Sequence, residues 1–192
     1  MLAAPAIESE KDIISRCQLG EGEAFEKILL KYQKRIFNFI KLMVRDAELA
    51  KDMTQETFTR AYAALNTFRI ESDFSPWLYR IAYNICHDYI RSKARREEQT
   101  DQEAEDESDL WHTRLSKPEE VYQTSELRER LLSSLEKLKP IFREALILRH
   151  YEEFSYAEIA EILGVSVNAV RIRVLGARLE MQKLLKEFQN ET

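Results

Sequence analysis

Apolar residues recur at every third or fourth position over most of this 192-residue chain, which is the period of an amphipathic helix. In the N-terminal half, the pattern predicts a short helix that begins at Ser9 and is closed by Gly20. Three longer helices follow. The first spans residues 24–44, the second begins after Asp46, and the third opens at Ser75-Pro76, where a capping residue precedes a helix-starting proline. The N-terminal half is therefore expected to be a helical module.

The C-terminal half continues the helical period in shorter pieces. Leucines at helical spacing start at Leu127, Pro140 interrupts the pattern, and a more buried helix is expected over residues 141–151. Two short helices separated by Gly164 complete this half. Only four glycines and four prolines occur in the chain, which disfavours an all-β fold. The predicted fold class is all-α: two small helical domains joined by an acidic flexible linker, with a C-terminal helix-turn-helix.

The net charge of −5 is concentrated between the two halves. Residues 97–110 contain eight acidic residues and no basic one, whereas residues 1–96 carry 16 Lys and Arg against 13 Asp and Glu. Like charges repel and almost nothing in the acidic stretch can be buried, so we expect it to be solvated. The expected organisation is an N-terminal domain over 1–96, an acidic linker over 97–118 and a C-terminal domain over 119–192.

The strongest local motif lies in the C-terminal domain. Ser155 followed by Glu158 is a capping box that starts a helix, and Gly164 fits the left-handed position that ends it. Ser166 then caps a second helix. A short turn between two such helices fixes a crossing near a right angle, which lets the second helix enter a DNA major groove. The alternative is an ordinary helical hairpin with a charged, solvated face.

The outward face of this second helix supplies candidate base contacts. Arginine can pair with guanine and asparagine with adenine, and apolar groups can contact the thymine methyl. The predicted duplex-reading residues are Ser166, Asn168, Ala169, Arg171, Ile172, Arg173 and Arg178.

A second candidate interface follows the helix that opens at Ser75-Pro76. Its polar stripe runs into the basic segment 91–96, and aromatic residues such as Phe74 and Trp77 are dense nearby. Basic residues mixed with aromatics suit single-stranded or distorted nucleic acid, whose unpaired bases can stack. Equally, the aromatics can be core and the arginines a solvated face. The candidate residues are Arg80, Asn84, Arg91, Arg95 and Arg96.

A third, weaker feature is a polar patch on the helix that begins after Asp46. It faces away from the apolar stripe of that helix and consists of Asp52, Gln55, Glu56 and Thr59. Such a patch can dock a basic partner surface, or it can simply face solvent.

Nothing in the sequence indicates catalysis. The three histidines form no metal-ligand spacing with each other or with Cys17 and Cys86, and no glycine-rich phosphate loop or nucleophile arrangement is recognisable. We therefore expect no enzyme activity, no metal and no cofactor. Both cysteines are expected to be buried free thiols. Since there is no bilayer-length apolar run and no signal peptide, the expected location is the cytoplasm, without membrane insertion.

Taken in order, these segments resemble the extracytoplasmic-function (ECF) sigma factors of bacterial RNA polymerase. The resemblance covers nearly the whole chain apart from the first residues and the linker. The matching stretches are 22–25, 52–58 with 60–62, 77–84 with Asp88 and Arg91, 118–119 and the helix-turn-helix up to Arg178.

The resemblance implies that the N-terminal domain binds the polymerase core with the patch that carries Asp52, Gln55 and Glu56. The same domain would open and read the −10 element, holding an unstacked base near Asn84 with the loop 69–75. The C-terminal domain would read the −35 element with its second helix. The implied partners are the RNA polymerase core, promoter DNA and an anti-sigma factor.

The second helix departs from the family pattern at Ile172, Leu175 and Gly176, which replace polar or basic residues. A glycine within a helix also costs about 1 kcal/mol relative to alanine. The alternative function is a helix-turn-helix transcriptional regulator that is not a polymerase subunit. Such a regulator would need a receiver or ligand-binding domain, whereas the N-terminal half lacks the alternating strand and helix pattern of one.

Overall fold

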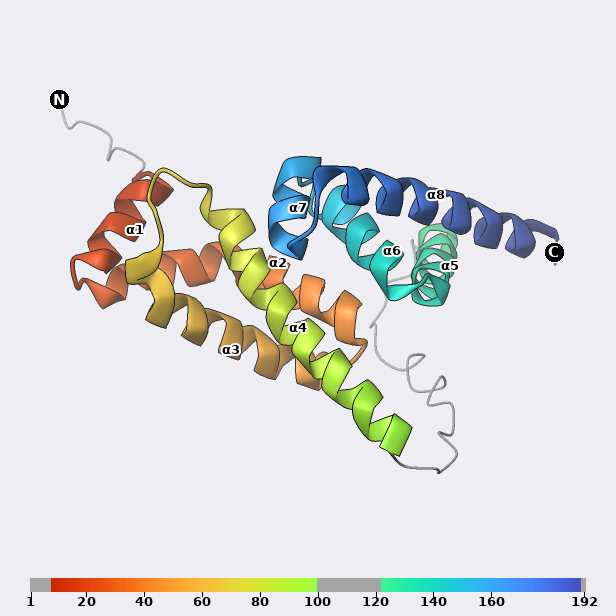
Figure 1. Ribbon diagram of the computed structural model, residues 1–192, viewed down its shortest axis with the longest axis horizontal. Coiled ribbons are helices and arrows are strands. Elements are labelled where there is room, and N and C mark those ends of the chain that lie inside the picture. Colours follow the sequence, from red (N-terminus) through yellow and green to blue (C-terminus); the bar gives the residue numbers. More distant parts are fainter. Residues whose placement is uncertain (1–7, 100–121, 191–192) are drawn as a thin grey trace.

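The computed structural model describes residues 8–99 and 122–190, and every regular element within these ranges is helical. The all-α prediction is therefore confirmed. Most of the predicted linker lies outside the described residues. The elements are α1 (Glu10–Gln18), η1 (Gly22–Ala24), α2 (Phe25–Val44), α3 (Ala47–Ala64), η2 (Leu65–Thr67), α4 (Phe74–Gln99), α5 (Tyr122–Lys137), α6 (Pro140–Leu146), η4 (Ile147–Tyr151), α7 (Tyr156–Leu163) and α8 (Val167–Asn190), as Figure 1 shows.

Helices α1 to α4 form the N-terminal module, in which α2 packs against both α3 and α4. The expected caps are present. Ser9 and Asp12 form a reciprocal capping box on α1, and the Asp46 carboxylate accepts hydrogen bonds from the first backbone N–H groups of α3. One boundary differs from the prediction, because α4 begins at Phe74 rather than after Ser75. Pro76 therefore lies within the first turn, where its missing N–H breaks no hydrogen bond.

Helices α5 to α8 form the C-terminal module. Ser155 and Glu158 make the predicted capping box, Gly164 is left-handed at φ 65°, and the Ser166 hydroxyl accepts a hydrogen bond from the Ala169 N–H. The structure also explains Gly176. A Cβ at this position would lie 2.8 Å from the Phe142 ring, so glycine lets α6 and α8 approach closely.

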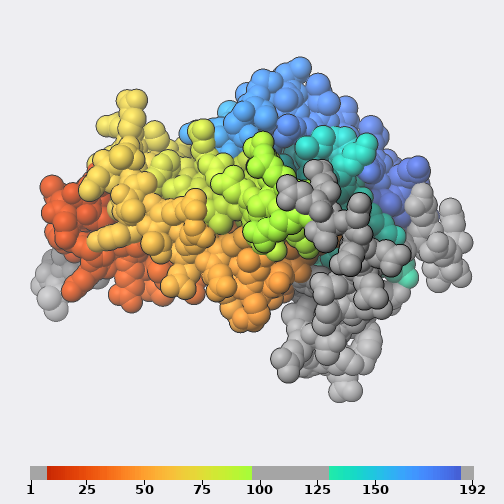
Figure 2. Space-filling model, turned by 60° about the horizontal axis from the view of Figure 1, so that its bottom comes forward, coloured from red at the N-terminus to blue at the C-terminus, as the bar shows by residue number. Residues whose placement is uncertain are grey.

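The two modules pack against each other, and α4 is the helix they share. It contacts α2 and α3 on one side and α7 on the other. Figure 2 shows the green residues of α4 bordered below by orange residues of the N-terminal module and above by blue residues of the C-terminal helices. Beside the buried apolar stripe of Leu78, Ala82 and Ile85, α4 therefore buries a second one, made of Tyr79, Tyr83 and Cys86.

The backbone is unusual at two places where the modules meet. Residues 147–151 form a π-helical turn, and Glu153 just after it is left-handed with φ 63°. Arg45, which ends α2, has the same φ of 63°. Among the described residues these are the two non-glycine positions with positive φ, a conformation that costs a residue with a Cβ on the order of 1–2 kcal/mol.

Cys17 and Cys86 are both buried free thiols, as expected. Burial raises the pKa of the Cys86 thiol to about 12, so this group is a neutral part of the core. In residues 8–99 and 122–190, no three His, Cys, Asp or Glu side chains are grouped so that they could hold a metal ion. Within the same ranges, no helix combines the length and the apolar character that crossing a membrane requires.

Candidate nucleic-acid interface

The second helix of the helix-turn-helix, α8, is held by one buried face. Val170, Val174 and Ala177 are buried, and the rest of the helix up to Lys186 is exposed or half-buried. The predicted reading residues Ser166, Asn168, Arg171, Ile172 and Arg178 are all exposed, whereas Ala169 and Arg173 are half-buried. Helix α7 supports this arrangement with the buried side chains of Ile159, Ile162 and Leu163.

An apolar stripe runs along the centre of the exposed face of α8. Ile172, Leu175 and Leu179 are 62%, 60% and 60% exposed, and they share one side of the helix. Arg171 and Arg173 lie on opposite sides of this stripe. Residues two positions apart in a helix are separated by about 160° around its axis. Arg178 donates a 3.1 Å hydrogen bond to Nε2 of His150. The arginines therefore do not form one continuous basic surface.

The outward stripe of α4 is more uniform. Its five candidate residues, namely Arg80, Asn84, Arg91, Arg95 and Arg96, are all exposed. Opposite charges are sparse on this stripe, which contains the single acid Asp88 among the described residues between Arg80 and Arg96. Such a basic face attracts a phosphate backbone.

The aromatic residues near α4 are mainly structural. Phe68, Phe74 and Trp77 form a cluster with ring centroids 5.1 to 5.3 Å apart, and Phe68 and Phe74 are buried. The sequence is compatible with Phe74 as either a core residue or a residue that stacks on bases, and the structure shows that it is a core residue. Trp77 is half-buried, so part of its ring stays accessible.

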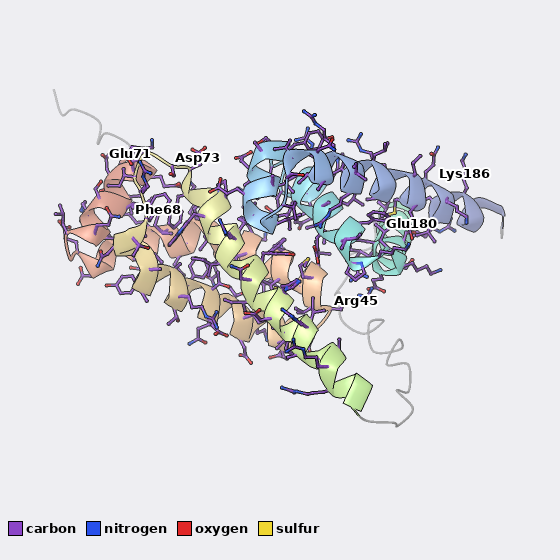
Figure 3. All side chains as sticks on the ribbon, in the orientation of Figure 1. Arg45, Phe68, Glu71, Asp73, Glu180 and Lys186 are labelled. Atoms are coloured by element: carbon purple, nitrogen blue, oxygen red, sulfur yellow. The ribbon has the colours of Figure 1, made fainter. Side chains whose placement is uncertain are left out.

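This cluster anchors the loop between η2 and α4, where Figure 3 labels Phe68, Glu71 and Asp73. The loop residues 71–73 are exposed, and the loop turns through a hydrogen bond of 2.9 Å from the Ser72 N–H to the Arg69 carbonyl. Gln18 fixes the start of the loop by donating to the carbonyls of Leu65 and Phe68 at 2.8 and 2.9 Å. Gln18 is a positioning residue that no motif in the sequence indicates.

The polar patch of α3 is exposed to solvent. Asp52, Gln55, Glu56 and Thr59 are exposed, while Met53, Thr57 and Phe58 face the core. Glu56 pairs with Arg60 one turn later at 2.5 Å, and the Thr59 hydroxyl donates to the Gln55 carbonyl. Asp52 makes the patch acidic at its N-terminal end, so a basic partner surface is complementary to it.

The two candidate nucleic-acid faces meet at a cleft between the modules. This cleft has a volume of about 480 Å³, and both Asn84 of α4 and Arg173 of α8 line it. Glu144 lies in the same cleft and is buried, with its Oε2 3.4 Å from the Tyr83 hydroxyl. Burial raises the pKa of the Glu144 carboxyl, and the nearby His87 and Arg173 lower it in part. Burial, together with Glu144, raises the pKa of Tyr83 to about 12.

A second buried carboxylate, that of Glu152, joins the two modules. Glu152 follows η4, and its Oε2 accepts a 2.5 Å hydrogen bond from the Tyr79 hydroxyl. The same oxygen accepts from Nε and Nη2 of Arg35 on α2, at 3.2 and 3.0 Å. The Tyr79 ring lies between Phe39 of its own module and Phe154 of the other, with centroids 5.2 and 4.9 Å away. Of these residues, the sequence pattern singles out only Tyr79, as one of the aromatic residues near the basic stripe of α4, and gives no sign of its contact with Glu152.

Two helical modules, one with a basic helix stripe and one with a helix-turn-helix, are typical of a nucleic-acid-binding protein, and the comparisons with known proteins identify the family. The family model for Sigma-70 region 2 matches residues 28–96, and the model for Sigma-70 region 4 matches residues 128–181. Together these matches cover more than half of the chain. The chain belongs to the sigma-70 family and is an RNA polymerase sigma factor. The N-terminal module is thus sigma region 2, and not the receiver domain that a regulator would need.

Relatives that match nearly end to end fall in the expected group. The chain is 35% identical over 188 residues to the RNA polymerase sigma-H factor of Pseudomonas aeruginosa. The match covers 96% of this chain and 97% of that protein. It is 33% identical over 174 residues to the ECF RNA polymerase sigma-E factor of Escherichia coli K12, covering 88% and 91%. The resemblance to ECF sigma factors is therefore confirmed.

Solved structures share the fold. The sigma factor RpoE of Bartonella quintana, solved in complex with the anti-sigma factor NepR, superposes with a TM-score of 0.70 at 26% identity. This match covers 84% of the present chain and 96% of that one, so it includes both modules. CnrH, solved in complex with the cytosolic domain of CnrY, has a TM-score of 0.68 at 24% identity, over 93% and 97% of the two chains.

Proposed function

We propose that the two modules divide the promoter between them. The exposed basic stripe of α4, with Arg80, Asn84, Arg91, Arg95 and Arg96, contacts the −10 element as its strands separate. The exposed face of α8 contacts the −35 duplex through Ser166, Asn168, Ala169, Arg171, Ile172, Arg173 and Arg178. The observation that carries this proposal is the pairing of a basic helix and a helix-turn-helix in one chain whose family is the sigma-70 family.

The polymerase core is proposed to bind the patch of Asp52, Gln55, Glu56 and Thr59. All four residues are exposed on one face of α3, and their helix is anchored by buried residues on its other face. On this assignment, residues 1–96 hold the polymerase and the −10 element, residues 97–118 connect, and residues 119–192 hold the −35 element. The site of action is then the cytoplasm, where the polymerase is.

An anti-sigma partner is part of the proposal. Its support is the likeness of this chain, over both modules, to the RpoE that was solved together with NepR. A partner that covers the two DNA-facing helices would withhold the sigma factor until a signal releases it.

Reconstitution with bacterial core polymerase tests the assignment. The purified chain is expected to direct transcripts that start at specific promoters. Reversing charge with Asp52→Lys and Glu56→Lys should weaken core binding, because a basic partner surface would then meet like charge. Glu26→Lys, which changes an exposed acid on α2, is the matched control and should leave core affinity unchanged. Unchanged affinity in the α3 variants would remove the patch from the interface.

DNA contacts are tested in the same assay. Arg171→Ala and Arg173→Ala should each weaken binding to a −35 duplex by about 1–3 kcal/mol if the side chain reads a base. If the side chain contacts phosphate instead, the dependence of binding on salt should become less steep. Asn84→Ala should reduce opening of the −10 element without changing −35 affinity. Promoter use that is indifferent to all three substitutions contradicts the assignment.

A further inference from the structure

The side-chain amide of Gln18, the last residue of α1, connects this helix to the segment that leads into α4. Its Nε2 donates to the carbonyl oxygens of Leu65 and Phe68, at 2.8 and 2.9 Å. Phe68 is the residue at which η2 ends, and its backbone is already extended there, with φ −73° and ψ 132°. A carbonyl at the end of a helical turn has no donor within the turn, so Gln18 supplies the missing donor from another helix.

The far end of the same loop is also linked to α1. Phe74, the first residue of α4, packs its ring against that of Tyr32, with the two centroids 5.8 Å apart. The Tyr32 hydroxyl donates at 2.9 Å to Oε2 of Glu10, in the first turn of α1. Helix α1 itself packs against η2, and Figure 1 shows it beside the loop between η2 and α4. Both ends of the loop 69–73 are therefore fixed relative to α1.

Between these anchors the loop faces solvent. Ile70 is half-buried, whereas Arg69, Glu71, Ser72 and Asp73 are exposed. Figure 3 labels Glu71 and Asp73 on the loop and Phe68 at its start. Carboxylates accept hydrogen bonds, and the amino groups on base edges donate them, as that of cytosine does to glutamate or aspartate. The exposed part of the loop thus carries groups that can read a base edge.

The loop borders the N-terminal end of the basic stripe of α4. The Phe68 ring packs on Trp77 with centroids 5.1 Å apart, and Trp77 stays half-exposed. Trp77, Arg80 and Asn84 share one side of α4, since residues three and four positions apart in a helix face the same way. An accessible aromatic ring next to hydrogen-bonding groups suits an unpaired base, which can stack on the ring while its edge is read.

We propose that Gln18 is a positioning residue for −10 recognition, because its two hydrogen bonds hold the loop 69–73 where the loop can read an unstacked base beside Trp77. The proposal rests on the proposed contact between α4 and the −10 element. Gln18 acts through the loop and not on the DNA. Readout of a base edge depends on where the hydrogen-bonding atoms are placed. Loss of the two bonds should therefore reduce discrimination between bases at −10, while −35 affinity and core affinity stay unchanged.

Discrimination is measured with the full chain bound to bacterial core polymerase. Open-complex formation is compared between a promoter that the wild-type chain uses and versions of it with one base of the −10 element replaced. Gln18→Met removes the donors and keeps an unbranched side chain, and it should lower this ratio by about three- to tenfold at one position. Gln18→Glu keeps the shape but presents only acceptors to the two carbonyls, so it should lower the ratio at least as far. General destabilisation reduces the active fraction equally on all promoters, and the ratio is insensitive to it.

A rescue variant, a matched control and a second readout accompany this assay. Gln18→Lys places an ammonium donor near the same two carbonyls and should keep the wild-type ratio. Gln33→Met changes an exposed glutamine of α2 and should also leave the ratio unchanged. The second readout is amide hydrogen exchange in the chain without polymerase or DNA. Gln18→Met should speed exchange of the Ser72 N–H, which closes the loop on the Arg69 carbonyl, by about three- to tenfold, with no change in α8.

Three results would overturn the positioning role of Gln18. They are an unchanged base ratio in Gln18→Met and Gln18→Glu, a reduced ratio that Gln18→Lys does not restore, and unchanged exchange of the Ser72 N–H in Gln18→Met. Failure of the proposed function is a separate observation. It would be seen as an absence of promoter-specific transcripts when the wild-type chain is added to core polymerase, whereas hydrogen exchange reports the state of the loop without polymerase or DNA.

Discussion

The two helices proposed to read DNA are of similar length but are built into the molecule in different ways. Helix α4 lies between the two modules, and it buries side chains toward both of them. Helix α8 packs by one face only, on α5, α6 and α7, and leaves Ile172, Leu175 and Leu179 exposed. A helix covered on two sides keeps only a narrow outward stripe, and that of α4 is almost entirely basic.

This difference separates two ways of contacting nucleic acid. The stripe of α4 offers charge, which suits a phosphate backbone and depends on salt. The face of α8 offers an apolar centre with an arginine on each flank, which suits contact with thymine methyl groups between phosphate or guanine contacts. We therefore expect −35 binding to be less sensitive to salt than −10 binding, as titrations of each DNA element at several salt concentrations would measure.

The largest expected effect is on stability, from matched leucine substitutions in the two helices. Leu78 of α4 is fully buried and Leu179 of α8 is 60% exposed. Leu78→Ala should lower the free energy of unfolding by about 2–5 kcal/mol, because it leaves a cavity between packed helices. Leu179→Ala should stay within about 0.5 kcal/mol of wild type. Urea unfolding followed by circular dichroism measures both, and equal losses would contradict the one-sided packing of α8.

A smaller effect is expected where α8 does pack tightly. Gly176→Ala would place a Cβ 2.8 Å from the Phe142 ring, so α6 and α8 would have to separate. Overpacking of this kind costs about 1–3 kcal/mol, against about 1 kcal/mol gained from helix propensity. The net result should be a modest loss of stability. Phe142→Leu in the same chain should restore part of it, and a stability gain in the single variant would show that Phe142 moves freely.

Much of this architecture was predictable because its signals are local. Capping boxes at Ser9 and Ser155, the cap at Asp46 and the left-handed Gly164 depend on residues a few positions apart, and all four are present. The sequence predicts that α4 begins after Ser75, whereas the helix begins at Phe74. The pattern does not separate the two, because a proline is tolerated at both the first and the third helical position. The exposure of the three residue sets proposed to bind partners follows from the same helical periodicity.

The contact between the modules could not be predicted in the same way. Glu152, Tyr79 and Arg35 are far apart in sequence, and a glutamate after a helix resembles any solvated acid. One signal was available: Tyr79, Tyr83 and Cys86 form a second helical stripe on α4, beside the stripe that begins with Leu78. A helix with two apolar stripes needs neighbours on both sides, so the second stripe indicates a further docking partner, although it does not identify which.

The smallest effect is expected from Glu144, the buried acid that lines the cleft together with residues of α4 and α8. Burial raises the pKa of Glu144, so its charged form is disfavoured in the folded chain. A raised pKa in an acid means that its stabilising contribution is present below the ordinary value of about 4.5 and is lost as the pH rises through the raised value. His87, Arg173, Tyr83 and Arg143 face this carboxyl and moderate the effect.

Glu144→Gln should therefore stabilise the chain slightly at neutral pH, by no more than about 3 °C in Tm, and the gain should shrink as the pH falls through the raised pKa of Glu144 toward 4.5. Glutamine can still accept the hydrogen bond from the Tyr83 hydroxyl, so packing in the cleft is kept. Thermal unfolding over a pH series measures the difference, with Glu161→Gln on the exposed side of α7 as the control. A gain that stays constant with pH would mean that burial does not shift the pKa of Glu144, and that its carboxyl is solvated in the folded chain.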